Sequence, residues 1–154
     1  MKQNDSLLIT PSDLPLFASR PDIMLILNAT TRLSSIDLDG LDEDQEKTAF
    51  LCNVCNLLIL HALITLGHQS GLTSSSWSER RSAYNCIGYH IGQMGFVSLS
   101  GLMRQLVGPD LGNNLEMQIT GNLTWDLGNK QALFAVSLGT LQSPLVKVEI
   151  SANS

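Results

Sequence analysis

The longest apolar stretch of the chain runs from Ala49 to Leu66, where nearly every position is hydrophobic. Asp42 precedes this stretch with Gln45 three positions later, a pattern typical of the capping box that begins a helix. Gly67 follows it, and glycine is common just past the end of a helix. The pattern therefore predicts one long helix from Asp42 to Leu66. Because this helix is apolar nearly all round, other elements should cover it on most sides.

Shorter patterns on either side predict three further helices and two irregular segments. The first helix begins at Pro21, a favoured first residue, and continues to about Leu33. A short helix is expected at Glu79–Tyr84 and an amphipathic one at Ser98–Val107. Residues 68–78 are polar and rich in serine, and Asn85–Gly95 contains three glycines. We expect a loop in the first of these segments and irregular structure in the second.

The last third of the chain changes character and predicts strands. Leu115–Thr120 and Leu145–Ile150 alternate, and Ala132–Leu138 is a continuous apolar run. Helices that come first and strands that follow indicate an α+β fold, with a buried central helix surrounded by helices and a small C-terminal sheet. Residues 1–20 are expected to form a flexible N-terminal arm, and residues 21–154 a single domain.

The chain has few charged residues and a net negative charge, and both features bear on which partners it can bind. Of 154 residues, 44% are hydrophobic and 15% are charged, and the net charge is −5. Lysine and arginine are scattered, so no basic stripe is available for a nucleic acid, and we expect none to bind. The low charge suggests a domain of a larger protein, or one that buries surface against a protein partner. The acidic run between Asp37 and Glu46 fits helix capping and a solvated surface, and leaves a basic partner patch open.

The cysteines and the N-terminus indicate a cytoplasmic, reducing setting. Three cysteines are an odd number, which argues against a secreted disulfide framework. The apolar run Leu7–Ile9 is too short for the core of a signal peptide. The stretch from Ala49 to Leu66 approaches the length of a bilayer span, but its polar residues and acidic flank favour a buried core helix. We therefore expect no membrane span.

The central helix carries polar side chains that are costly to bury without partners. Asn53 and Asn56 lie one turn apart on one face, and His61 lies on an adjoining face. One interpretation is a polar cluster that lines a cleft together with Tyr84 and His90. The other, which we favour, is that these groups tie neighbouring loops to the helix, because most buried polar groups serve architecture.

Cys52 and Cys55 form a C-x-x-C pair inside the central helix. In redox proteins this motif lies at the start of a helix, where the dipole lowers the pKa of the thiol. Together with Cys86 and a histidine the pair could bind zinc, but two small hydrophobic residues in a core helix are the favoured interpretation. The sequence predicts no metal and no cofactor.

The order and spacing of several short motifs resemble the domain of unknown function 547 family over about Ile36 to Ile150. The family's first motif is matched in register by Lys47, Ala49, Phe50, Asn53, Asn56, Leu58, His61 and Ala62. The family's second motif resembles Tyr84, Ile87 and Gly88, and its third motif resembles Phe96, Ser98 and Leu99. The closing motif resembles Phe134, Ala135, Val136, Gly139, Ser143, Pro144 and Val148.

The departures from this family concern its chemistry. The resemblance implies a relation to papain-like or transglutaminase-like cysteine enzymes, with a cysteine and a histidine in the closing motif. In this chain those positions are Leu138 and Leu133, and the family's glutamate is replaced by Met103. A leucine has neither a thiolate nor a ring that carries a proton.

Two functions from different classes follow. The first is a non-catalytic interaction or scaffold domain of a larger intracellular protein, which is a pseudoenzyme if the family is catalytic. The second is a cysteine-hydrolase-like enzyme that uses replacement groups such as His61, His90 or Cys86. A third hypothesis is a truncated splice product without an independent fold. The sequence leaves the oligomeric state open.

Overall fold

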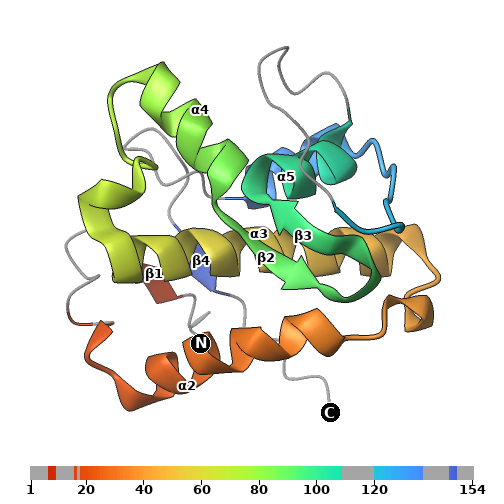
Figure 1. Ribbon diagram of the computed structural model, residues 1–154, viewed down its shortest axis with the longest axis horizontal. Coiled ribbons are helices and arrows are strands. Elements are labelled where there is room, and N and C mark those ends of the chain that lie inside the picture. Colours follow the sequence, from red (N-terminus) through yellow and green to blue (C-terminus); the bar gives the residue numbers. More distant parts are fainter. Residues whose placement is uncertain (1–6, 10–15, 17, 109–119, 137–145, 149–154) are drawn as a thin grey trace, which may run out of the picture.

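Helix α3, Asp44–Leu66, forms the centre of the molecule, and the other elements pack around it (Figure 1). The structure is a computed structural model that describes residues 7–9, 16, 18–108, 120–136 and 146–148. Helix α2, Pro21–Ala29, lies along one side of α3. Helices α4, Trp77–Cys86, and α5, Leu99–Val107, lie on the other side. The fold class is α+β with a central helix and small sheets, as the sequence predicted.

The start of α3 differs from the prediction, and its end agrees with it. The capping box at Asp42 is wrong: the N-cap is Glu43 in extended conformation, and no side chain in the described residues caps this end. The path into the helix is set instead by a tertiary contact, because the backbone N–H of Leu38 donates to Oε1 of Gln93 at 3.2 Å. At the other end, Gly67 takes a φ of +56°, which glycine adopts without strain.

Residues 85–95 are more regular than their glycines suggested. Strand β2, Gly88–Ile91, pairs antiparallel with β3, Gly95–Ser98, and Tyr89 lies opposite Val97. The expectation of irregular structure was wrong because two glycines build the hairpin connection. Gly92 and Gly95 have φ values of +40° and +65°, which other residues rarely adopt.

The predicted C-terminal strands are only partly correct. Val146–Val148 forms strand β4, but its partner is the N-terminal strand β1, Leu7–Ile9, within the segment expected to be a flexible arm. The run that begins at Ala132 is not a strand over its described part, because Lys130–Ala135 forms a 3-10 helix. A short apolar run cannot be assigned to strand or helix from periodicity alone. The strand predicted at Leu115–Thr120 lies almost wholly outside the described residues.

The core is divided into two clusters. The main cluster joins α3 to α4, α5 and the β2–β3 hairpin, and Leu51, Ile59 and Leu102 are fully buried in it. A separate small cluster joins α2 to the opposite side of α3. Within the described part of the chain, α3 is the one helix long and apolar enough to cross a bilayer, so these residues do not form a multi-span membrane protein.

Candidate functional site

The two asparagines of α3 have different environments although they lie one turn apart. Asn53 is exposed, whereas Asn56 is half-buried. The Nδ2 atom of Asn56 donates a hydrogen bond of 2.8 Å to the carbonyl oxygen of Ala135 in the 3-10 helix Lys130–Ala135. Asn56 therefore ties a late segment of the chain to the central helix, which is the architectural role that the sequence favoured.

We expect Asn56→Leu to destabilise the protein by about 1 kcal/mol, because the carbonyl of Ala135 loses a donor that water replaces only in part. Asn53→Leu is the matched control, since it makes the same chemical change on the exposed position one turn away. Urea denaturation of both variants measures the difference. Equal midpoints for the two variants would contradict the bridging role of Asn56.

His61 belongs to a polar network that joins three segments. Its Nδ1 atom lies 2.7 Å from the hydroxyl of Tyr89 on β2, and the two ring centroids are 5.7 Å apart. Tyr89 also has a side-chain hydrogen bond with Thr30, the first residue of the 3-10 helix Thr30–Ser35. The buried hydroxyl of Thr30 in turn donates to the carbonyl oxygen of Leu27 at 2.6 Å. The network thus connects α3, the hairpin and the end of α2.

The ionisation of this network favours neutral groups. Burial lowers the pKa of His61 below its ordinary value of 6.5. Burial raises the pKa of Tyr89 well above its ordinary value of 10.0, and the hydrogen bond with Thr30 opposes this shift. At neutral pH these shifts favour a neutral imidazole on His61 and a protonated phenol on Tyr89. Both forms are suited to the hydrogen bond between the two side chains. Tyr89 is, however, a poorer acid than a free tyrosine, which disfavours a role in proton transfer.

The lowered pKa of His61 predicts that stability decreases in mild acid. The unfolded chain takes up a proton at this residue near pH 6.5, whereas the folded protein does so only at lower pH. The stabilising contribution is therefore complete above pH 6.5 and is lost as the pH falls through the folded pKa. Urea unfolding between about pH 7.5 and 5.5 measures the slope.

His61→Gln should reduce that slope, and His90→Gln, which changes an exposed histidine, should retain it. A profile that is the same in the wild type and in His61→Gln would show that the environment of His61 is not the cause.

The remaining predicted site residues have partners elsewhere. Tyr84 is buried and packs edge-on against Trp77 within α4, with centroids 6.2 Å apart. His90 is exposed and contacts Phe96 across the hairpin, at 5.6 Å between centroids. Successive residues of a strand point to opposite faces, so His90 projects away from the side on which Tyr89 meets His61. Among the described residues, the side chains that contact His61, Tyr84 and His90 therefore lie on separate elements.

An open cleft that the sequence did not indicate lies beside the end of α3. It has a volume of about 450 Å³ between the 3-10 helix Gly67–Ser70 and α4. Polar and apolar groups both line it, among them Leu66, Gln69, Ser78, Glu79, Ser82 and Cys86. The serine-rich composition of this region was visible in the sequence, but it gave no sign of a concave surface.

The three cysteines fall into two classes. Cys52 and Cys55 are buried in α3, and burial raises the pKa of both thiols above 9.0, with the neighbouring Cys52 adding to the effect on Cys55. Cys86, at the end of α4, is exposed beside the cleft. Among the described residues, no three histidine, cysteine, aspartate or glutamate side chains are grouped so that they could hold a metal ion.

These environments predict that one thiol of three reacts in the folded protein. A thiol-specific disulfide reagent should modify Cys86 at a rate near that of a free thiol, and should modify Cys52 and Cys55 only when the chain unfolds. Cys86→Ser should remove the fast phase. A second fast thiol in the native protein would contradict the burial of the pair.

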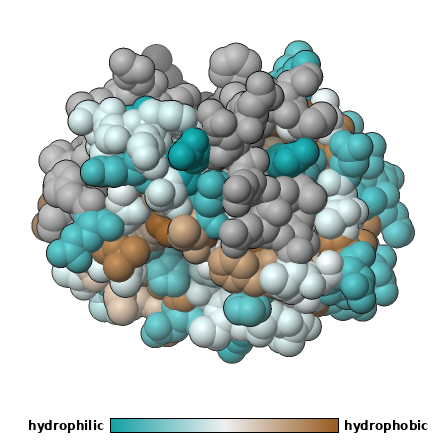
Figure 2. All heavy atoms as spheres, turned by 45° about the horizontal axis from the view of Figure 1, so that its top comes forward, coloured by the Kyte–Doolittle hydropathy of each residue, from teal (hydrophilic) through white to brown (hydrophobic). Residues whose placement is uncertain are grey.

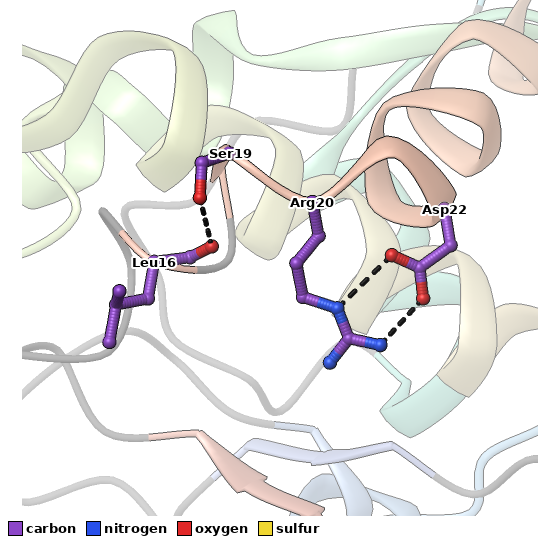
Figure 3. Close-up of polar contacts among 4 residues, drawn as sticks. All are labelled: Leu16, Ser19, Arg20 and Asp22. Carbon is purple, nitrogen blue, oxygen red and sulfur yellow. Dashed lines mark hydrogen bonds and ion pairs between the residues drawn. The ribbon is translucent and has the colours of Figure 1, made fainter.

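A further candidate surface is α2, which begins in a well-defined turn. The hydroxyl of Ser19 donates to the carbonyl oxygen of Leu16 at 2.8 Å (Figure 3). The guanidinium of Arg20 binds both carboxylate oxygens of Asp22, at 3.1 and 2.7 Å (Figure 3). This ion pair lowers the pKa of Asp22 and balances the charge at this end of the helix. Pro21 follows as the first helical residue, as predicted.

Helix α2 is apolar on its outer side as well as on its inner side. Ile23 and Leu27 are buried in the small cluster with α3. Met24, Leu25 and Ile26 retain exposed fractions of 44%, 70% and 51%. We call these three residues the outer face of α2. By contrast, on the face drawn in Figure 2 the described hydrophobic residues form separate patches between polar ones.

Comparisons with known proteins give no relative for this chain. No protein-family model matches it, and neither a curated protein nor a solved structure does. Leu138 and the side chain of Leu133, which occupy the expected catalytic positions, lie outside the described part of the chain.

Proposed function

We propose that this chain is a non-catalytic interaction domain of a larger intracellular protein, and that the outer face of α2 is its docking surface. The observation that carries the proposal is the exposure of three consecutive large apolar residues, Met24, Leu25 and Ile26, which spread around the outer half of one helix. Single exposed apolar residues are ordinary, but a contiguous group of large ones marks an interaction site.

The charges around this face indicate what kind of partner fits. Arg20 and Asp22 neutralise each other at the start of α2, and no other residue of the helix is charged. A strongly charged partner would gain nothing at this surface and would lose hydration. The complementary surface is therefore the uncharged, apolar face of a helix on another protein.

The motif resemblance supports the non-catalytic part of the proposal. As a divergent member of the domain of unknown function 547 family, the chain would have Leu138 and Leu133 where the family has its cysteine and histidine. Of the described histidine side chains, His61 is engaged with Tyr89 and His90 contacts Phe96. The raised pKa values of Cys52 and Cys55 disfavour both as nucleophiles.

The second function, a cysteine-hydrolase-like enzyme, depends on one observation, the exposed Cys86 beside an open cleft. The thiol measurement described above separates the two proposals. A Cys86 that reacts far faster than a free thiol would favour the enzyme, because an activated nucleophile has a lowered pKa.

The docking surface can be tested in cells with a photo-crosslinking amino acid at position 25 of the full chain. We expect a discrete cross-linked product with a second protein, and its loss when Ile26→Glu is added. The same probe at Arg32, exposed on the neighbouring 3-10 helix, is the control and should give no such product. Identical products at both positions, no product at position 25, or a cross-link only to a second copy of the chain would each overturn the proposal.

A further inference from the structure

The inner side of α2 is attached to the molecule through contacts that are separate from the main core. Ile23 and Leu27, four positions apart, pack against Leu60, with Leu57 and Ile64 at the edges of the contact. None of these five residues belongs to the main cluster between α3, α4, α5 and the hairpin. The apolar strip of α3 formed by Leu57, Leu60 and Ile64 thus already holds a helix through two aliphatic residues, which is a recurring geometry of helix recognition.

The chain that follows α2 is firmly fixed at its far end. The amide of Gln93 donates to the carboxylate of Asp37 at 3.1 Å, and its carbonyl oxygen accepts from the backbone of Leu38. At the turn of the hairpin, a Cβ atom on Gly92 would collide with the carbonyl oxygen of Ile36, so the two backbones are in close contact there. This anchor, residues 36–38, holds the connection independently of α2.

Between the anchor and α2, the network of Thr30, Tyr89 and His61 is the polar contact that holds the segment down. The 3-10 helix Thr30–Ser35 also packs through Leu33 against the main cluster, so it stays attached to the core. Helix α2 itself is secured by the small apolar contact of Ile23 and Leu27 with α3. Elements with few buried contacts open at lower free energy than the core. When α2 is away from α3, both sides of α2 and the apolar strip of α3 are free to bind other apolar surfaces.

We propose that α2 opens about the 3-10 helix Thr30–Ser35, and that the uncovered apolar strip of Leu57, Leu60 and Ile64 accepts a helix in trans with two aliphatic residues four positions apart. Helix α2 is then an internal competitor for this strip. The inference goes beyond docking on the outer face of α2, because in this case the partner replaces α2 instead of covering it. The two surfaces are on opposite sides of α2, so each can fail without the other.

The probe is a labelled synthetic peptide of residues 20–35 of this chain, added to the full-length protein. Leu27→Asp in the protein weakens the internal competitor, so we expect the peptide to bind at least tenfold more tightly to this variant than to the wild type. Leu16→Asp is the matched control, because it makes the same chemical change at a leucine that is 71% exposed and lies outside both proposed surfaces, and it should leave peptide binding unchanged. A peptide that carries Leu27→Asp should not bind.

Hydrogen exchange of α5 shows whether the opening is local. The amides of α5 should remain as protected in Leu27→Asp as in the wild type, because α5 belongs to the main cluster. Loss of that protection would mean that α2 cannot separate without the core, which overturns the proposal. Equal peptide binding to Leu27→Asp and Leu16→Asp, or no saturable binding to either, would overturn it as well.

Discussion

Replacement of Leu51 by alanine is expected to destabilise the protein by about 2–5 kcal/mol. Leu51 is fully buried in α3 within the main cluster. Truncation removes its apolar contacts and leaves a cavity that the other residues of the main cluster can fill only in part. Since a domain of this size is stable by roughly 5–15 kcal/mol, the loss is a large fraction of the total.

Leu66→Ala makes the identical chemical change on the same helix and serves as the control. Leu66 is 46% exposed at the end of α3, so its truncation should cost less than about 1 kcal/mol. Urea denaturation of the two variants, monitored by far-ultraviolet circular dichroism, gives both free energies of unfolding. Similar losses for Leu51→Ala and Leu66→Ala would mean that α3 is not buried as the structure shows.

The helices could be predicted from the sequence because their signals are local and strong. The apolar run of α3 and the glycine that ends it gave the extent of the helix to within two residues of its start. Pro21 gave the start of α2, and the apolar spacing of α5 gave that helix almost to its ends. These features depend on hydrophobic periodicity and on backbone preferences that operate within a few residues.

The pairing of the strands could not be predicted, in one sheet because the partners are distant along the chain and in the other because glycines obscure a short hairpin. The N-terminal strand β1 is only three residues long and finds its partner, β4, at the opposite end of the chain. The β2–β3 hairpin has short strands, and the glycines of its connection were interpreted as a sign of irregular structure. The alternation at Leu145–Ile150 predicted β4 but not its partner, and a strand as short as β1 carries too little alternation of its own to be recognised.

In the candidate site, too, the features that depend on local sequence were predicted and those that depend on tertiary contacts were not. Asn56 and His61 were identified as polar groups that need partners, and each has one. The partners, Ala135 and Tyr89, were not predictable, because they come from segments 79 and 28 positions away. The outer face of α2 was also missed, since an apolar helix pattern does not reveal which of its sides stays uncovered.

Gln105 is a buried polar residue that the sequence analysis did not single out, although it organises the chain after α5. Its side-chain oxygen accepts a hydrogen bond of 2.8 Å from the backbone N–H of Trp125. Its amide nitrogen lies 3.4 Å from the carbonyl oxygen of Gly101, one turn earlier in α5. The backbone of the same residue accepts from Leu127 at 3.0 Å. One glutamine therefore holds the chain at Trp125 and Leu127 against α5.

Gln105→Leu is expected to destabilise the protein by about 1–3 kcal/mol. Leucine fills nearly the same space, so packing is largely kept, but the part-buried N–H of Trp125 loses its acceptor and bears the cost of desolvation. Gln131→Leu, at an exposed position in the 3-10 helix Lys130–Ala135, makes the same change without loss of a buried bond and should be nearly neutral. Urea denaturation measures the free energies of both variants.

Hydrogen exchange identifies which part of the molecule loses stability in Gln105→Leu. The amide of Trp125 should exchange faster in this variant, together with that of Leu127, which donates to the backbone of residue 105. The amides of the β2–β3 hairpin, whose pairing is independent of this bond, should keep their protection. A missing acceptor should first reduce the protection of the segment whose N–H group it bound. A uniform loss of protection across the molecule would instead mean that leucine disturbs the packing of α5.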